Sequence, residues 1–194
     1  IGQSDNAFTP LQLATYCATI ANNGTRLKTH LVKKVTNYSR EQTLSETQPE
    51  VVAKTEISQS NLKAVQQAMR SVTQSGGTAS SVFGNYRISI AAKTGTAENP
   101  GHSDNTVFIA YAPYENPEIA VAVVLEYGSR GMYSMNVAKD IFDAYFYGKT
   151  VDENGNLVMP AQNIVQNSSP EDDQNTSSTN SDTQNSASEN TSSQ

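Results

Sequence analysis

The residues best suited to chemistry are Lys93-Thr94-Gly95-Thr96, which follow the apolar run Ile88–Ala92. This run predicts a β-strand that carries the four residues. Side chains alternate along a strand, so Thr94 and Thr96 share one face, while Gly95 leaves room for a substrate backbone to approach. Two hydroxyls and the Lys93 ammonium can bind a carboxylate, and a strand N–H can donate to a developing oxyanion. These residue types favour a site that binds a carboxylate beside a reacting carbonyl.

A short K-T-G pattern also occurs as an ordinary amphipathic strand that runs into a glycine turn. The surrounding segments favour the functional interpretation. They resemble the class B penicillin-binding proteins, a group in which K-T-G is one of three signature elements. The resemblance runs from residue 1 to about residue 148, and it is carried by the motif and by Ile1–Gln3, Asn6–Ala14, Val72–Ala79, Ala97–His102, Phe108–Pro113 and Glu115–Val121.

The resemblance implies a serine-type D,D-transpeptidase that cross-links peptidoglycan stem peptides by acyl transfer, with β-lactams as substrate mimics. It assigns Lys93, Thr94, Gly95 and Thr96 to the catalytic site. The hydroxyls of Thr94 and Thr96 would bind the substrate carboxylate, and the Thr96 N–H would be an oxyanion donor. No cofactor and no metal are implied. The implied fold is α/β, with an antiparallel sheet packed on helices, as part of the penicillin-binding protein and serine β-lactamase fold.

In this family the S-x-x-K box, which holds the nucleophilic Ser, and the S-x-N box lie upstream of the segment with which this chain opens. We therefore expect the C-terminal part of a transpeptidase domain, inactive alone and completed by the N-terminal half of the same domain. Formal matches within the chain are Ser60-Asn61-Leu62-Lys63, Ser4-Asp5-Asn6 and Ser103-Asp104-Asn105. Ser60 precedes a helical apolar stripe, so it is predicted to cap a helix rather than to attack a substrate.

Two alternatives stay open on the sequence: a non-catalytic penicillin-binding-like binding or sensor module, and a β-lactamase-type hydrolase. An upstream S-x-x-K box followed by S-x-N would favour the enzyme, and the absence of both would favour the module. The family implies a place at the extracytoplasmic face of the bacterial cell membrane, through an N-terminal anchor. No run in this sequence predicts a transmembrane helix.

The resemblance implies a transpeptidase portion at 1–150, followed by a linker at 151–166, and composition predicts a disordered tail at 167–194. The tail is almost wholly Ser, Asn, Thr, Gln and acid, and cannot bury enough apolar surface to offset its ordering entropy. No basic cluster favours nucleic acid. The single cysteine, Cys17, is predicted to be a buried hydrophobe. His30 has no carboxylate or histidine at the spacing of metal ligands. His102 follows the motif in a loop, where a histidine is usually solvated; the alternative is that it lines the site.

Periodicity and capping residues predict the remaining elements. Helices are expected at 10–22, 60–74 and 135–147, and strands at 31–37, 51–53, 86–96, 105–112 and 118–126. Short links make the last three strands antiparallel neighbours. The last helix is expected to cover the sheet with Val137, Ile141 and Tyr145. The absent half of the domain should leave one sheet edge and one apolar face uncovered.

Overall fold

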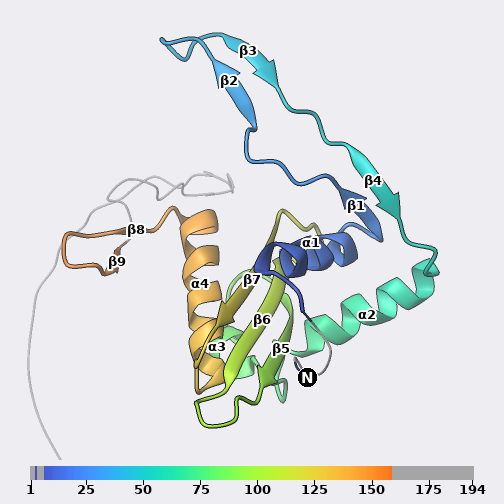
Figure 1. Ribbon diagram of the computed structural model, residues 1–194, viewed down its shortest axis with the longest axis vertical. Coiled ribbons are helices and arrows are strands. Elements are labelled where there is room, and N and C mark those ends of the chain that lie inside the picture. Colours follow the sequence, from blue (N-terminus) through green and yellow to red (C-terminus); the bar gives the residue numbers. More distant parts are fainter. Residues whose placement is uncertain (1–2, 4–6, 159–194) are drawn as a thin grey trace, which may run out of the picture. The chain divides into compact units, whose positions relative to one another are not determined.

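A three-stranded antiparallel sheet lies at the centre of the computed structural model, which describes residues 3 and 7–158 (Figure 1). Its strands are β5 (Ala91–Ala97), β6 (Asn105–Ala112) and β7 (Ile119–Leu125), in that order. The predicted antiparallel sheet is confirmed. In register, Thr94 lies opposite Phe108 and Thr96 opposite Thr106.

The first of these strands is shorter than its apolar pattern predicts. It was expected from residue 86, but it begins at Ala91. The Ile90 carbonyl accepts a hydrogen bond from Thr73 Oγ1 at 2.6 Å, and Arg87 and Ile88 form a bend. A side-chain donor from elsewhere in the chain thus occupies a carbonyl just ahead of the strand.

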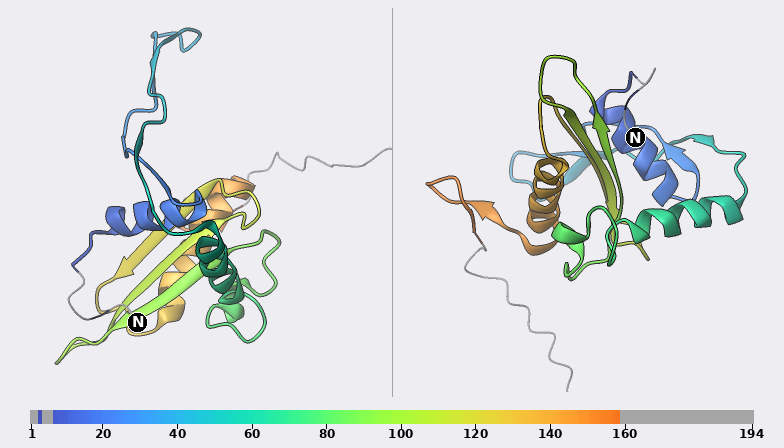
Figure 2. Two further views of the ribbon diagram at one scale, coloured as in Figure 1. Left: turned by 90° about the vertical axis from the view of Figure 1, so that its right-hand side faces the viewer. Right: turned by 90° about the horizontal axis from the view of Figure 1, so that it is seen from below.

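Helices cover both faces of the sheet (Figure 2). On one face α1 (Pro10–Ala21) and α2 (Gln59–Ser71) pack with Ala91, Ile109 and Tyr111. On the other face α3 (Ser80–Phe83) and α4 (Gly131–Tyr147) pack in a core that includes Ala92, Phe83, Phe108, Ala138 and Phe142. Ala91 and Ala92, which are neighbours on β5, therefore belong to the cores on the two opposite faces of the sheet, as alternation along a strand requires.

Helix α1 forms as its caps predict. Thr9 Oγ1 accepts from the Gln12 N–H, the Gln12 side chain accepts from the Thr9 N–H, and Pro10 occupies the first turn. The chain leaves the helix through Gly24 at φ 85°. Cys17 is fully buried in the same apolar cluster as Met69 of α2, and burial raises the pKa of its thiol to about 12. The prediction of a small buried hydrophobe is confirmed.

The sequence pattern predicts the N-cap of α2 at Ser60, two residues later than the structure has it. Ser58 is the N-cap, and its Oγ accepts from the Asn61 N–H at 3.3 Å. Ser60 lies in the first turn with an exposed side chain, 3.0 Å from the Ser58 hydroxyl. Lys63 is also exposed. A Ser at either position can satisfy a free N–H of the first turn, so the pattern alone does not separate the two.

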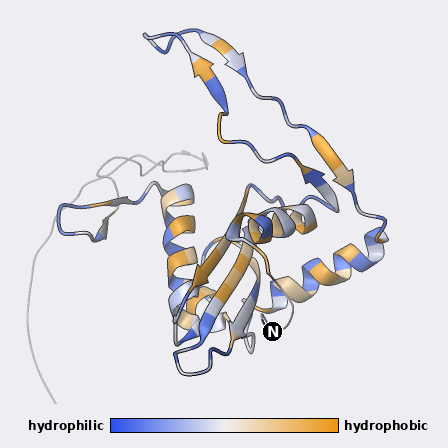
Figure 3. Ribbon diagram, in the orientation of Figure 1, coloured by the Kyte–Doolittle hydropathy of each residue, from blue (hydrophilic) through white to orange (hydrophobic). Residues whose placement is uncertain are grey.

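Helix α4 buries a different face from the one predicted. Its buried side chains include Met135, Ala138 and Phe142, whereas Val137, Ile141 and Tyr145 are 40%, 38% and 52% exposed. Apolar residues occupy both the buried and the exposed side of the helix, and Figure 3 shows hydrophobic segments along much of its length. Periodicity alone therefore did not identify the core face. Ala138 and Phe142 pack against the sheet and Phe83. The helix also begins at Gly131, four residues before the predicted start at 135.

A buried carboxylate fastens the C-terminal end of α4. Asp143 is 2% exposed and accepts hydrogen bonds of 2.7 Å from Tyr86 Oη, Lys139 Nζ and Lys149 Nζ. Burial alone would raise the pKa of Asp143, but hydrogen bonds from the two lysines and Tyr86 hold it below its usual value. Three segments are thereby joined through one charged group: α4, the residue that follows Gly148, and the turn after α3.

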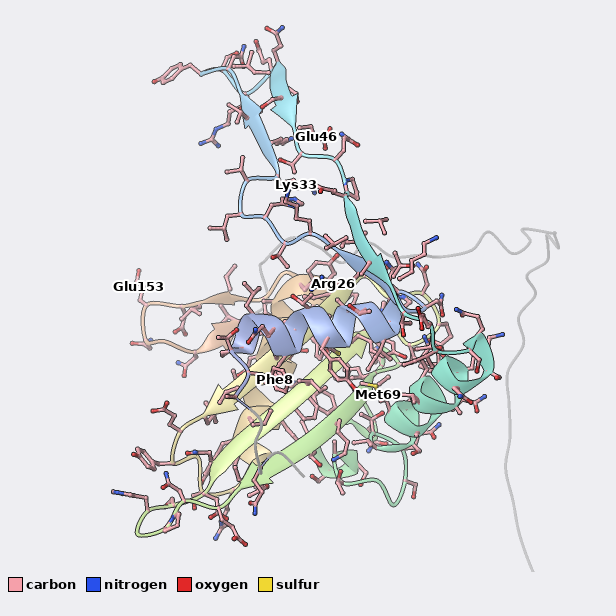
Figure 4. The ribbon with its side chains drawn as sticks, turned by 45° about the vertical axis from the view of Figure 1, so that its right-hand side comes forward. Phe8, Arg26, Lys33, Glu46, Met69 and Glu153 are labelled. Atoms are coloured by element: carbon pink, nitrogen blue, oxygen red, sulfur yellow. The ribbon has the colours of Figure 1, made fainter. Side chains whose placement is uncertain are left out.

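Between α1 and α2 the chain forms two pairs of short strands. Strand β1 (Thr25–Leu27) pairs with β4 (Val51–Lys54), and β2 (Lys34–Thr36) pairs with β3 (Thr43–Glu46). The strand expected at 31–37 is thus confined to its second half, and that at 51–53 is present. Lys33 and Glu46 mark the base of the β2–β3 hairpin (Figure 4).

The last described segment is a small hairpin of β8 (Thr150–Val151) and β9 (Leu157–Val158). It occupies the start of the predicted linker. The rest of the linker and the predicted tail at 167–194 lie outside the described residues. Among the described residues, no helix is long and apolar enough to cross a membrane.

Candidate functional site

The motif predicted to carry the chemistry lies on an edge strand. Lys93, Thr94, Gly95 and Thr96 all belong to β5, which pairs with β6 on one side and with no strand on the other among the described residues. Because side chains alternate along a strand, Thr94 and Thr96 lie on the same face as Ala92, and Lys93 lies on the same face as Ala91. On the side away from β6, the backbone groups of β5 form no strand ladder among the described residues.

The side chains of the motif differ in exposure. Lys93 and Thr96 are exposed, and Thr94 and Gly95 are intermediate. Lys93 Nζ donates to the Thr94 carbonyl, and no carboxylate lies within ion-pair distance of it in the part of the chain that the structure describes. Its positive charge is not neutralised by a neighbouring acid. A half-buried hydroxyl, an exposed hydroxyl and a cation together suit an anionic group.

A residue that sequence reasoning did not single out contacts the motif. Thr78 Oγ1 lies 3.1 Å from Thr94 Oγ1, at hydrogen-bond distance. Thr78 belongs to the Gly76-Gly77-Thr78-Ala79 segment. This segment supports the family resemblance, but its sequence pattern assigns Thr78 no function. Two threonine hydroxyls sixteen residues apart carry no periodic signal, so only the folded chain reveals the pair.

Loops gather at the end of β5 where the motif finishes. The Glu98 N–H donates to Gln3 Oε1 at 2.9 Å, which places the Gln3 side chain at this end. The rings of His102 and Tyr127 lie 4.9 Å apart. His102 is thus placed near the end of β5 but is exposed, and the structure gives it no contact with Thr94 or Thr96.

The formal S-D-N match at residues 103–105 has a structural role. The Asp104 carbonyl accepts from the Ser129 N–H, and Asn105 Oδ1 accepts from the Tyr127 N–H at 2.8 Å. These bonds hold the 127–129 turn, in which Tyr127 and Ser129 have positive φ values of 53° and 59°. The match at Ser4-Asp5-Asn6 lies outside the described residues.

Among residues 3 and 7–158, the arrangement offers recognition groups, and no Ser hydroxyl forms a hydrogen bond with a Lys or His base that would activate it. Ser60 and Lys63, the formal S-x-x-K pair, lie exposed on α2. The described residues hold no group of three or more His, Cys, Asp or Glu side chains that could bind a metal ion. The motif can bind a carboxylate through Thr94 and Thr96 and can present a backbone N–H to an oxyanion.

A cavity of about 680 Å³ lies away from the motif. It is lined by small residues of α1, by β1 and by the turn into β7, including Ala14, Ala18, Asn22, Thr25 and Ile119. No residue of the K-T-G motif contributes to it. It therefore offers no support for a substrate pocket at Lys93–Thr96.

Comparison with known proteins gives a consistent result. Residues 1–147 match the family described as the penicillin binding protein transpeptidase domain. Penicillin-binding protein 2A of Bacillus subtilis is 35% identical over 187 residues, which cover 86% of this chain and 26% of that protein. The peptidoglycan D,D-transpeptidase PbpA of Mycolicibacterium smegmatis is 39% identical over 134 residues, which cover 66% and 26%.

Solved structures agree with the family match. Penicillin-binding protein 2B of Streptococcus pneumoniae superposes with a TM-score of 0.64 at 34% identity, over 75% of this chain and 26% of that one. Penicillin-binding protein A of M. tuberculosis, solved as an imipenem acyl-enzyme complex, gives 0.61 at 29% identity, over 75% and 32%. This chain spans about a quarter of the length of the curated relatives that it matches. The resemblance inferred from the sequence is confirmed: the chain belongs to the penicillin-binding protein transpeptidase family and covers part of that domain.

Proposed function

We propose that this chain supplies the K-T-G side of the active site of a peptidoglycan D,D-transpeptidase. The observation that carries the proposal is the position of Lys93–Thr96 on the free edge of β5, in a chain of this family. A free edge lets a peptide-like substrate lie alongside the strand. The motif then meets the substrate with hydroxyls, an N–H and a positive charge.

The reaction is acyl transfer through an acyl-serine. The hydroxyl of a Ser outside this chain attacks the carbonyl of the penultimate D-Ala, and its proton passes to a base. The C–N bond breaks, the terminal D-Ala leaves with a proton on its amine, and the amine of a second stem peptide displaces the Ser. A β-lactam undergoes only the first half of this reaction, the attack by the Ser, and leaves the enzyme acylated.

This chain contributes binding and electrostatic stabilisation to that reaction. The hydroxyls of Thr94 and Thr96 hold the terminal carboxylate of the stem peptide or the carboxylate of a β-lactam. The Thr96 N–H donates to the oxyanion that forms on the attacked carbonyl, where a preorganised donor has its largest effect. Lys93 adds a positive charge close to both.

The rest of the domain is proposed to cover the apolar surface that this chain exposes. Tyr133, Val137, Ile141 and Tyr145 form a row at every fourth residue of α4, and all are at least 38% exposed. Strand β7 has a free edge among the described residues. The cavity beside α1 lies on the opposite face of the sheet. The proposed partner is the N-terminal half of the same domain, and the intact protein acts at the extracytoplasmic face of the membrane.

The isolated chain is expected to form no covalent adduct with penicillin, because the motif offers recognition without a nucleophile. The measurement is incubation with labelled penicillin followed by a denaturing gel. The intact enzyme is the positive control and should give a stable band. A band from the isolated chain that disappears in Ser60→Ala would contradict the proposal and identify Ser60 as the nucleophile.

The α4 row gives a second prediction. In the isolated chain, Val137→Lys should change the free energy of unfolding by less than about 1 kcal/mol, because Val137 is 40% exposed. In the intact domain the same change should cost at least about 2 kcal/mol, because it buries a charge without a partner. Asn136→Lys, on an exposed position of the same helix, is the control. Equal effects in the two proteins would show that the row stays uncovered.

A further inference from the structure

The Thr78–Thr94 hydroxyl pair is the contact from which a further role can be inferred. Thr94 Oγ1 lies 3.1 Å from Thr78 Oγ1. Among the described residues, Thr78 Oγ1 makes no other hydrogen bond. The proposed function gives Thr94 a second partner, the substrate carboxylate, so the same hydroxyl must serve Thr78 and the substrate together.

The loop that carries Thr78 is held firmly. Gly76 has a φ of 81°, and a Cβ at Gly77 would lie 2.3 Å from the carbonyl oxygens of Ser71 and Val72. These glycines allow a tight turn that a side chain would prevent. The Ala79 N–H donates to the Val72 carbonyl at 2.9 Å, and the Ala79 side chain is fully buried.

The same loop is also fastened to the residue that leads into β5. Thr73 is 1% exposed, and its Oγ1 donates to the Ile90 carbonyl at 2.6 Å. The loop therefore contacts the β5 segment at two places, Ile90 and Thr94. Thr78 is held by backbone bonds and packing that do not depend on a substrate.

A hydroxyl has one proton to donate and can accept two hydrogen bonds. If Thr94 donated to Thr78, its proton would be unavailable to the substrate. If Thr78 donates to Thr94, the Thr94 proton is free for a carboxylate, which can only accept. A carboxylate at Thr94 thus selects the second arrangement, and hydrogen bonds linked in this way strengthen one another.

We propose that Thr78 is a positioning residue of the active site, which donates to Thr94 Oγ1 and so directs the Thr94 proton to the substrate carboxylate. This inference rests on the proposed function, because it requires Thr94 to bind that carboxylate. It assigns Thr78 no contact with the substrate. Its consequence is that loss of the Thr78 hydroxyl impairs acylation only through Thr94.

The test uses the intact enzyme and the second-order rate constant of acylation by benzylpenicillin. Thr78→Val keeps the shape of the side chain without its hydroxyl and should lower the rate constant about threefold to tenfold, the loss of one hydrogen bond. Thr78→Ser should remain close to the parent. Ser75→Ala, which removes an exposed hydroxyl from the same loop, is the control and should have no effect.

A double-mutant cycle and a modified substrate separate positioning from a structural role. In a Thr94→Val background, Thr78→Val should cause no further loss. Acylation by the methyl ester of benzylpenicillin, which lacks the carboxylate, should be unaffected by Thr78→Val. Melting temperatures of all variants are measured on the same samples. A structural defect would lower acylation by the acid and the ester together.

Three outcomes would overturn the inference. If Thr78→Val were acylated like the parent while Thr94→Val was impaired, Thr78 would have no positioning role and the Thr94 site would stand. Equal losses from Thr78→Val with and without the Thr94 hydroxyl would show that Thr78 acts independently, by direct contact or through the fold. If Thr94→Val were acylated at the parent rate, Thr94 would not bind the carboxylate, and both this inference and the carboxylate site of the proposed function would be wrong.

Discussion

In the intact enzyme, Lys93→Ala is expected to lower the rate constant of acylation by benzylpenicillin more than about a hundredfold, and Thr94→Val about tenfold to a hundredfold. Thr94→Val removes a hydrogen bond to a charged group, worth about 1.5–3 kcal/mol, and keeps a β-branched side chain on the strand. Lys93→Ala removes a full charge from a site that the substrate partly desolvates, where charges are poorly screened.

The control for Lys93 is Lys63→Ala, which removes an exposed lysine from α2. It should acylate like the parent enzyme. Acylation kinetics and melting temperature, measured on the same samples, distinguish a chemical role from a structural one. Unchanged kinetics in both Lys93→Ala and Thr94→Val, with a loss of stability only, would mean that the K-T-G motif is an ordinary strand.

Asp143→Asn is expected to lower the free energy of unfolding of this chain by about 2–4 kcal/mol. The substitution removes the charge that accepts from Tyr86, Lys139 and Lys149, and hydrogen bonds to a buried charged group are among the strongest in proteins. Asp140→Asn, an exposed acid on the same helix, should change stability by less than about 0.5 kcal/mol. Urea unfolding at neutral pH measures both.

The same carboxylate gives a pH dependence of known sign. The folded-state pKa of Asp143 lies below its usual value, so folding favours the ionised form. The stabilisation is complete above the unfolded pKa of about 3.9, and is lost as pH falls through the lower folded-state pKa. The parent should therefore lose its advantage over Asp143→Asn as pH falls from about 5 to 2. A constant difference across that range would assign the effect to packing.

The sequence alone determined those features that depend on neighbouring residues. The strand at 105–112 has the bounds expected from alternation, and the first helix begins at Pro10, as the Thr9 cap predicts. Lys93–Thr96 could be assigned to a strand, with Thr94 and Thr96 on one face, for the same reason. Each of these features follows from local backbone geometry, which a short window of sequence specifies.

Only the tertiary structure decided which of several local solutions is used. On α4, the rows that contain Val137 and Ala138 are both apolar, and the short Ala138 together with Phe142 fits against Phe83 and the sheet. Strand β5 begins at Ala91, which pairs with Tyr111 close to the end of its partner β6 at Ala112. Periodicity describes one element and carries no information about the partner of that element.

The Thr78–Thr94 pair has the same origin. Thr78 follows a turn that two glycines permit, and Thr94 lies on a strand, so neither pattern refers to the other. Their hydroxyls meet because the buried Ala79 and the Thr73–Ile90 bond fix the loop beside β5. Contacts between separate segments are set by packing. The sequence could therefore name the K-T-G motif, but the folded chain was needed to find the residue that orients it.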